Sequence, residues 1–351
     1  MIRLDKFRAA LKTDAAILHK PENMAYVLGY KGEGCIFVSR DYCAVITDFR
    51  YIEQCHLQCP GIPVFRTTID RTENAVIAQI VAEHPIGTLA LETDYITYDT
   101  YAGFEKALPA VRLEALGSLC ADLREFKDAG EIECICKAAD IACRAFVNWL
   151  DRIHAGMTEK EVRNLLNFEM LSLGSEGEAF KTIAAAGVNG ALPHAVPTDY
   201  VIREGDLLTV DFGATINGYR SDTTRTVGFG RISDRLREVY DTVLTAQKLA
   251  LDAIAPGKIC GDIDKIARDY IDARYPECFG HSLGHGVGLF IHEQPRVGSG
   301  SKTVLRPGHV VTVEPGVYIP GVGGCRIEDM AIMTSDGFIN PITAPKELIE
   351  L

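Results

Sequence analysis

The hydrophobic pattern of residues 1–122 alternates between short strand-like and helix-like segments. Apolar runs at residues 15–18, 44–46 and 88–91 are typical of buried strands, and the apolar period of residues 71–82 predicts a helix between the last two. This alternation favours a sheet covered by helices, which is an α/β arrangement. No glycine-rich phosphate-binding loop follows these strands, so the pattern gives little support to nucleotide binding.

The pattern changes at residues 121–131, where charged side chains concentrate, and a helix with one apolar face continues from Ile132. We interpret the charged run as a solvated linker and helix start, not as a binding patch. The change predicts two domains, residues 1–122 and residues 123–351. A chain of 351 residues has the length expected for two domains.

In the C-terminal part, amphipathic helices and strand-rich stretches come in separate runs. Thr158 and Glu161 have the spacing of a capping box, and Ser233 and Asp262 are each predicted to cap a further helix. Separate runs of helices and strands indicate an α+β domain. The strand-rich stretches are residues 206–230 and 309–332.

Composition narrows the possible partners and the cellular location. The formal charge is −12, from 36 Lys and Arg against 48 Asp and Glu, and such acidity disfavours binding to nucleic acid. No apolar stretch reaches the roughly 18 residues of a membrane span, and the N-terminus lacks the apolar core of a signal peptide. The 11 cysteines show no repeated CxxC pairs, so we expect reduced thiols in a cytoplasmic protein.

Two aspartates flank a predicted hairpin turn. Asp211 lies in an apolar, strand-like run, Asp222 follows further on, and Asn217-Gly218 between them is a strong turn signal. With that turn, Asp211 pairs with Thr224, and Asp222 lies diagonally on the same face, about 7–8 Å away at Cα. Two carboxylates so close repel each other unless a cation lies between them. The alternative is that both occupy solvated hairpin positions.

Three histidines, His281, His285 and His292, lie close together in a glycine-rich and otherwise apolar stretch. A single histidine in such a loop is usually incidental. Three together favour a role in metal binding or proton transfer, because neutral imidazole is the commonest metal ligand and titrates near neutral pH.

Carboxylates also occur in the last strand-rich stretch. Glu314 ends a β-branched apolar run that predicts a buried strand, where an unpaired charge would cost several kcal/mol. Arg326 and Glu328 have the spacing of residues on one side of a strand. The alternative for this pair is an Arg–Glu ion pair that closes a hairpin.

The three segments together supply four carboxylates and one imidazole. An oxygen-rich set with one nitrogen suits Mn²⁺, Co²⁺, Fe²⁺ or Zn²⁺ better than thiophilic ions. Four carboxylates carry too much negative charge for one ion, so we expect a dinuclear centre. Two metal ions about 3.5–4 Å apart can activate a bridging water and polarise a carbonyl, which favours hydrolysis of an amide or a phosphoester.

These residues together resemble the pita-bread metallopeptidases, the family of methionine aminopeptidase, prolidase and aminopeptidase P. The resemblance implies an α+β fold with a C-terminal pita-bread catalytic domain, preceded by a smaller creatinase-like α/β domain. Methionine aminopeptidases usually lack a domain like residues 1–120, so the proline-directed members fit best. The matching motifs are Val210-Asp211-Phe-Gly, Ser221-Asp222-Thr-Thr-Arg-Thr, Pro193-His194, Gly284-His285-Gly-Val-Gly, His292-Glu-Gln-Pro, Glu314-Pro-Gly and Arg326-Ile-Glu328-Asp329.

The resemblance implies that five residues bind two divalent metal ions, with Mn²⁺ as the first expectation and Co²⁺, Zn²⁺ or Fe²⁺ as alternatives. Asp211 would bind one ion with both oxygens. Asp222 and Glu328 would bridge the two ions, and His285 would complete the shell of the other ion. Glu314 would be the fifth ligand and also the acid/base that moves a proton from water to the leaving amine.

Four further residues receive roles from the same resemblance. His292 and His194 would stabilise the tetrahedral oxyanion or position the scissile carbonyl. His281 would line the substrate pocket, and Arg326 would steady the metal shell or the substrate carboxylate.

The leading expectation is a dinuclear aminopeptidase that hydrolyses the Xaa-Pro bond at peptide N-termini, with a metal-bridging hydroxide as nucleophile. Its partners would be peptides with proline in second position, and the family implies a homodimer. Residues 47–54 resemble a motif common in aminopeptidase P and short bacterial Xaa-Pro peptidases, although a structural role would also explain them. The alternatives are an Xaa-Pro dipeptidase restricted to dipeptides, a metal-free creatinase-type amidinohydrolase and a non-catalytic peptide-binding relative.

Overall fold

The computed structural model describes residues 2–351, and the chain divides into two compact units, Met1–Arg124 and Glu125–Leu351. The N-terminal unit is built on a six-stranded sheet of order β4-β3-β2-β1-β5-β6. Its strands are β1 Ala15–Leu18, β2 Cys35–Ser39, β3 Cys43–Thr47, β4 Val64–Arg66, β5 Thr88–Leu91 and β6 Arg112–Ala115. Its helices are α1 Ile2–Ala10, α2 Pro21–Leu28, the 3-10 turn η1 Phe49–Tyr51, α3 Ile52–Gln58, α4 Glu73–Glu83, α5 Tyr98–Ala107 and α6 Leu119–Glu125, which reaches the boundary.

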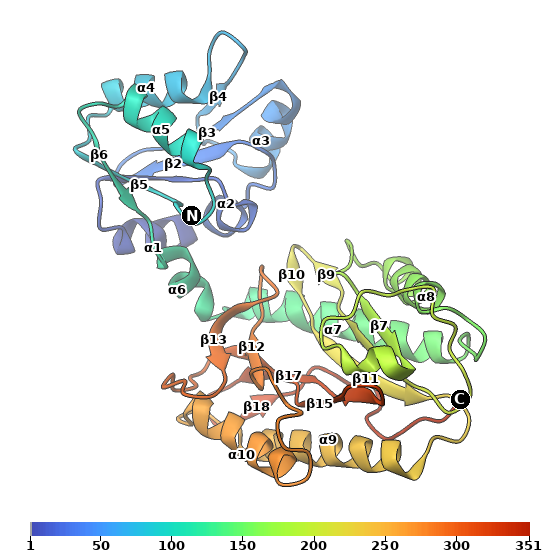
Figure 1. The fold of residues 1–351 in the computed structure, drawn as a ribbon. Coiled ribbons are helices and arrows are strands. Elements are labelled where there is room, and N and C mark those ends of the chain that lie inside the picture. Colours follow the sequence, from blue (N-terminus) through green and yellow to red (C-terminus); the bar gives the residue numbers. More distant parts are fainter. Residues whose placement is uncertain (1) are drawn as a thin grey trace. The chain divides into compact units, whose positions relative to one another are not determined.

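Helices cover both faces of this sheet (Figure 1). Strands β1, β5 and β6 run parallel, whereas β2 lies antiparallel between β1 and β3. On one face, Val76 and Ile80 of α4 and Phe104 of α5 join the buried core of the strands. The three strands and the helix predicted from the apolar pattern are therefore confirmed.

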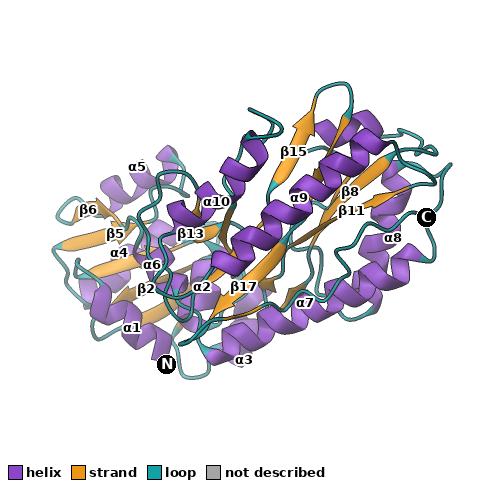
Figure 2. Ribbon diagram, turned by 90° about the horizontal axis from the view of Figure 1, so that it is seen from below, coloured by secondary structure: helices purple, strands orange, loops and turns teal. Residues whose placement is uncertain are grey.

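The C-terminal unit places its strands between two pairs of helices (Figures 1 and 2). Helices α7 and α8 pack together on one side, and α9 and α10 pack together on the other. These helices are α7 Ala129–Leu150, α8 Glu159–Ser172, α9 Asp234–Ala253 and α10 Cys260–Asp272, with a 3-10 turn η2 Gly187–Ala191. The apolar faces of α9 and α10 form one core with residues of the strands, among them Val311, Val317 and Ala331.

The strands of this unit form two main sheets and two short hairpins. The main sheets have the orders β11-β8-β7 and β13-β12-β14-β17-β18. The first half of the strands is β7 Ile183–Ala186, β8 Leu207–Phe212, β9 Thr215–Ile216, β10 Tyr219–Arg220 and β11 Thr223–Gly228. The second half is β12 Gly284–Gly286, β13 Glu293–Val297, β14 Val310–Val313, β15 Gly316–Ile319, β16 Gly323–Arg326, β17 Asp329–Met333 and β18 Phe338–Ile339.

The β8–β11 hairpin has the predicted register. Asp211 pairs with Thr224, and the strands reverse through Asn217 and Gly218, whose φ angles are 52° and 81°. Positive φ at both positions is what a tight hairpin turn between twisted strands requires, and Asn-Gly tolerates it best. A local turn signal therefore sets which side chains face each other in the centre of the unit.

Two of the three predicted helix caps are confirmed. Thr158 and Glu161 form a reciprocal capping box at the start of α8, and the Ser233 hydroxyl accepts a hydrogen bond from the backbone N–H of Leu236 at the start of α9. The prediction for Asp262 is wrong, because α10 already begins at Cys260. Asp262 lies instead in the first turn, where its charge still interacts favourably with the helix dipole.

The charged run at residues 121–131 is less solvated than we expected. Arg124, Lys127 and Glu131 are all buried, so the interpretation as a solvated linker is wrong for them. Their charges are held by partners: Lys127 lies 2.9 Å from Glu293, and the Tyr219 hydroxyl donates to Glu131 at 2.7 Å. Buried charges persist where partners offset the loss of water.

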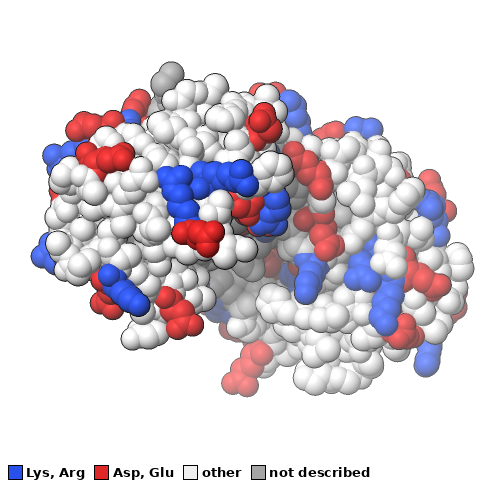
Figure 3. Space-filling model, turned by 90° about the horizontal axis from the view of Figure 1, so that it is seen from above, with Lys and Arg blue, Asp and Glu red and all other residues white. Residues whose placement is uncertain are grey.

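Surface and cysteine chemistry agree with the composition. Acidic and basic side chains are interspersed on the face drawn in Figure 3. Among residues 2–351, no helix combines the length and apolar character needed to cross a bilayer. All 11 cysteines have free thiols.

Candidate metal centre

The strands of the C-terminal unit bring the five predicted metal ligands together. Asp211 lies in β8, Asp222 directly precedes β11, His285 lies in β12, Glu314 directly follows β14, and Glu328 lies between β16 and β17. Ligand atoms of Asp222, His285 and Glu328 lie within 4.8 Å of one another. The other two carboxylates adjoin this group. Glu314 lies 3.2 Å from His285, and Asp211 pairs in register with Thr224, whose hydroxyl donates to Glu328.

The ring of His285 is oriented by the backbone. Its Nδ1 lies 3.0 Å from the carbonyl oxygen of Gly286, so the N–H at this position donates there. The other nitrogen, Nε2, then faces the carboxylates, 3.2 Å from Glu314 and 3.5 Å from Asp222. A backbone hydrogen bond on the remote nitrogen is the usual way in which proteins orient a metal-binding histidine.

Thr224 and Arg326 hold two of the carboxylates in place by hydrogen bonds and an ion pair. The Thr224 hydroxyl donates to Glu328 Oε2 at 2.8 Å and accepts a hydrogen bond from Arg326 Nε at 3.1 Å. Nη2 of Arg326 lies 2.6 Å from Asp211 Oδ2. The carboxylate that Arg326 pairs with is therefore Asp211, and the alternative of an ion pair with Glu328 is wrong. The two residues also do not share a strand, because β16 ends at Arg326 and β17 begins at Asp329.

The donor set fits divalent cations. One oxygen of Asp211 and one of Glu328 are buried without a hydrogen-bond partner among residues 2–351, although buried carboxylate oxygens are normally satisfied. Burial and then the charge of Asp211 raise the pKa of Asp222, and burial and the neighbouring carboxylates raise the pKa of Glu328. Cations would relieve both the unpaired oxygens and the mutual repulsion.

The raised pKa of His285 also indicates that this site favours a positive charge. Burial alone would lower its pKa, but the hydrogen bond and charge of Glu314 and the charge of Asp222 raise it to about 9. The pKa of Glu314 is lowered in turn, against the effect of burial, to about 2. Metal ions would compete with this imidazole proton, since a metal ligand must be deprotonated.

The remaining predicted residues lie around this group. His281 Nε2 is 2.9 Å from the Tyr318 hydroxyl, which accepts a hydrogen bond from Arg326 Nη1 at 2.9 Å. The ring of His292 meets that of His285 edge-on with centroids 4.4 Å apart. Burial lowers the pKa of both His281 and His292, so each is neutral near pH 7 and can donate or accept a proton.

His194 is exposed on the loop after η2. The preceding residue is anchored to the centre, because the carbonyl of Pro193 accepts a hydrogen bond from Arg326 at 3.1 Å. Of the predicted residues, His194 is thus the one held least directly in the cluster.

Sequence reasoning did not identify Thr224 and Tyr318, whose hydroxyls contact the Arg326 guanidinium in this site. Thr224 carried a usable signal, since the hairpin register already placed it opposite Asp211. Tyr318 carried none: its contact with Arg326 lies within the β15–β16 hairpin, but its contact with His281 joins segments 37 residues apart.

Comparison with known proteins places this centre in a family. Residues 133–335 match the model of metallopeptidase family M24, and residues 2–126 match that of the creatinase/prolidase N-terminal domain. The chain belongs to metallopeptidase family M24. The predicted α+β fold, a pita-bread domain preceded by a smaller creatinase-like domain, is confirmed, and so is the prediction of a metallopeptidase.

Full-length relatives of this M24 metallopeptidase carry proline-directed names. An Xaa-Pro dipeptidase from Pyrococcus furiosus is 36% identical over 354 residues, which cover 99% of this chain and 98% of the relative. A solved Xaa-Pro dipeptidase from Bacillus anthracis is 40% identical with a TM-score of 0.96, covering 100% of this chain and 99% of that one. An X-Pro aminopeptidase from Thermotoga maritima MSB8 is 34% identical with a TM-score of 0.92, covering 99% and 100%. These names support the dipeptidase alternative better than the leading aminopeptidase expectation.

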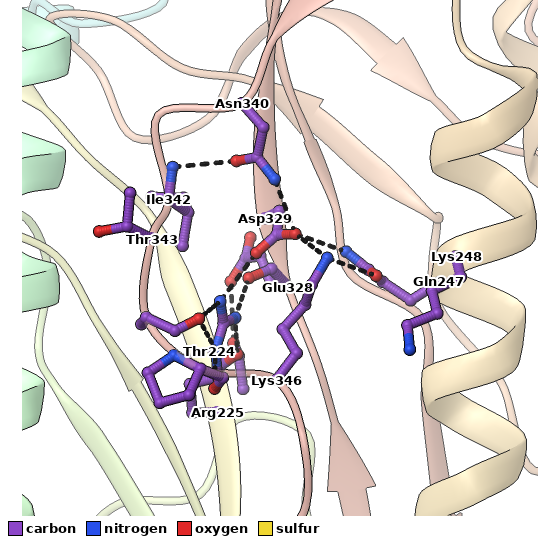
Figure 4. A network of polar contacts seen from close by, with 12 residues as sticks. Thr224, Arg225, Gln247, Lys248, Glu328, Asp329, Asn340, Ile342, Thr343 and Lys346 are labelled. Atoms are coloured by element: carbon purple, nitrogen blue, oxygen red, sulfur yellow. Dashed lines mark hydrogen bonds and ion pairs between the residues drawn. The ribbon is translucent and has the colours of Figure 1, made fainter.

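A buried polar network lies directly behind Glu328 in the M24 unit (Figure 4). Arg225 donates to the backbone carbonyl of Glu328 at 2.5 Å and forms an ion pair with Asp329 at 2.9 Å. Lys346 contacts the other oxygen of Asp329 at 2.6 Å, and Gln247 donates to the same oxygen at 3.1 Å. Burial opposes ionisation of Asp329, but the charges of Arg225 and Lys346 lower its pKa. The network thereby fixes the backbone on which Glu328 stands.

Proposed function

We propose that this M24 metallopeptidase is an Xaa-Pro dipeptidase, which hydrolyses dipeptides whose second residue is proline. The observation that carries the proposal is the similarity of the whole chain, at 40% identity and a TM-score of 0.96, to a protein named Xaa-Pro dipeptidase. The Pyrococcus furiosus relative of the same name supports it independently. The dipeptidase, an alternative in the sequence analysis, thus becomes the first candidate in place of the aminopeptidase.

We propose that two divalent ions, with Mn²⁺ as the first choice, bind to Asp211, Asp222, His285, Glu314 and Glu328. The set is rich in carboxylate oxygen and contains one imidazole, which suits Mn²⁺, Co²⁺, Fe²⁺ or Zn²⁺. Bound there, such ions supply Lewis-acid activation of water and of the scissile carbonyl. The unpaired oxygens of Asp211 and Glu328 support this assignment.

The residues of the chain would divide the remaining work. Glu314, whose Oε1 accepts from Thr312 at 3.1 Å, would accept a proton at its carboxylate and return it to the proline nitrogen. His292 and His194 would hold the scissile carbonyl and its developing negative charge. His281 and Arg326, joined through Tyr318, would orient the substrate and its terminal carboxylate. An Xaa-Pro bond lacks an N–H and has a rigid ring, so a dedicated site of this kind is needed.

The second candidate is an Xaa-Pro aminopeptidase, which accepts longer peptides. The similarity to the X-Pro aminopeptidase of Thermotoga maritima, at 34% identity over 99% of this chain, favours it. We further propose a homodimer and a cytoplasmic location, and the free thiols of the 11 cysteines support the latter.

Turnover of a peptide panel by the full chain, with the metal content measured in the same sample, tests the proposal. We expect kcat/KM on Xaa-Pro dipeptides to exceed that on Xaa-Pro-Xaa tripeptides by about tenfold or more, with Met-Ala peptides cleaved poorly. A preference for the tripeptides would instead establish the aminopeptidase. Hydrolysis of creatine by metal-free protein would support the amidinohydrolase, and peptide binding without any turnover would support the non-catalytic relative.

A further inference from the structure

The N-terminal unit contains its own group of metal-ligand side chains. His19 directly follows β1, Cys35 begins β2 and Glu73 begins α4, and each offers a ligand atom within 4.8 Å of the other two. Nε2 of His19 lies 2.8 Å from Glu73 Oε1. We propose that His19, Cys35 and Glu73 form a Zn²⁺-binding site in the N-terminal unit, chemically distinct from the M24 centre.

The position of His19 is set by a buried carboxylate. Oε2 of Glu92 accepts hydrogen bonds from the backbone N–H groups of His19, at 2.5 Å, and of Lys20, at 2.8 Å. The Asn23 amide donates to the other oxygen of Glu92, which is 2% exposed. Both oxygens of Glu92 are therefore engaged in holding the backbone, and His19 is presented from a fixed point. A preorganised ligand is what a metal site requires from its supporting residues.

One atom of this group lacks a partner. Nδ1 of His19 is buried and has no hydrogen bond within the described chain, residues 2–351. When Nε2 donates its proton to Glu73, Nδ1 carries an unshared lone pair. Buried polar atoms are rarely left without a partner, so this imidazole retains the capacity to bind a further group.

The mixture of donors selects the ion. One thiolate, one imidazole and one carboxylate are the ligand types that Zn²⁺ accepts together, whereas an oxygen-rich set suits Mn²⁺. Three protein ligands leave a fourth tetrahedral position for water. The Glu73 side chain is 30% exposed, so an ion can reach the group from solvent along it. Burial and Glu73 raise the pKa of the Cys35 thiol, so Zn²⁺ binding would form the sulfur–zinc bond and release the thiol proton to water.

Cobalt titration of the full-length protein, first stripped with a chelator, tests the proposal. Co²⁺ substitutes for Zn²⁺ and gives a thiolate-to-cobalt charge-transfer absorption only where sulfur is a ligand. The proposed ligands of the M24 centre include no sulfur, so this band reports on the N-terminal site alone. Because the M24 centre would take up two Co²⁺ ions per chain, we expect the band to saturate by the third equivalent. It should disappear on addition of Zn²⁺ and be absent in Cys35→Ser. Bound zinc should fall by one ion per chain in that variant.

Two further variants keep the test decisive. Cys43→Ser changes a buried cysteine of the neighbouring strand outside the group and should keep the band. Glu73→Gln changes a partly exposed residue, retains the thiol, and should weaken the Kd for Co²⁺ by at least about tenfold. Absence of the band in the wild-type protein, its persistence in Cys35→Ser, or an unchanged Kd in Glu73→Gln would each overturn the site. Where circular dichroism shows Cys35→Ser to be misfolded, Glu73→Gln decides.

Discussion

The two metal-ligand groups of this protein, one in each unit, differ in their charge and in how many of their polar atoms have hydrogen-bond partners. The C-terminal group gathers four carboxylates around one imidazole, and two of its buried oxygens have no partner within residues 2–351. The N-terminal group contains one carboxylate, Glu73, which lies 2.8 Å from His19, and its cysteine is neutral until a metal displaces the proton. The first group is held against its own electrostatic repulsion, whereas the second contains a single carboxylate and no pair of like charges.

This difference indicates what each group does. Repelling carboxylates that are kept together by surrounding strands are typical of sites that hold reactive cations, because stability alone would not select them. A group with one carboxylate, one imidazole and one thiol suits a single Zn²⁺ ion.

The largest effect is expected from removing one negative charge from each group in turn. Glu328→Gln should lower kcat on an Xaa-Pro dipeptide by more than about a hundredfold, because even supporting residues of metal sites have effects of that size. Glu73→Gln, the same change in the N-terminal unit, should alter kcat by less than about twofold. Steady-state kinetics with metal analysis measures both, and equal losses in the two variants would remove the contrast.

The next effect concerns the network behind Glu328. Arg225→Met leaves Asp329 buried beside only one cation, and we expect a loss of about 3–5 kcal/mol in the free energy of unfolding. Arg237→Met breaks the exposed ion pair with Glu350 and should leave the free energy of unfolding nearly unchanged, because exposed ion pairs contribute little to stability. Urea unfolding of both variants measures the two changes in stability. Similar midpoints would show that burial of the Arg225–Asp329 pair does not matter for stability.

A pH effect of intermediate size is expected from His309. Burial and then the charges of Lys127 and Arg306 lower its pKa to about 4, while the Glu125 carboxylate lies 3.2 Å away without reversing the shift. The unfolded chain takes up a proton at this histidine near pH 6.5, whereas the folded chain does so only near pH 4. His309 therefore leaves the free energy of unfolding unchanged above pH 6.5 and lowers it as the pH falls toward 4. His309→Asn should flatten the pH dependence of unfolding free energy between pH 6.5 and 4 by about 1–2 kcal/mol. Parallel curves for the variant and the wild type would contradict this assignment.

The smallest effect is expected from the hydroxyl that joins His281 to Arg326. Tyr318→Phe removes both hydrogen bonds and should lower kcat/KM by about fivefold, corresponding to roughly 1 kcal/mol. The same substitution at Tyr200, whose hydroxyl donates to Asp206, should leave kcat/KM unchanged. An effect at Tyr200 as large as that at Tyr318 would indicate a general loss of stability.

Prediction from sequence was strongest where the determining contacts are local. The capping box of Thr158 and Glu161 spans four residues, and the Asn217-Gly218 turn sets the pairing of Asp211 with Thr224. It was weaker for Asp262, because helices can begin a turn before a favourable cap. It failed for the partner of Arg326, since neither residue spacing nor strand period indicates which of four neighbouring carboxylates its guanidinium will meet.

The sequence by itself determined the residue types of the M24 centre, the strands and turns that carry them, and the family to which they belong. The tertiary structure alone decided that Thr224 reaches Glu328 across 104 residues of chain, that Arg326 pairs with Asp211, and that His19, Cys35 and Glu73 meet. The reason is physical: turns and caps depend on neighbouring residues, whereas these contacts depend on how distant segments pack into one core.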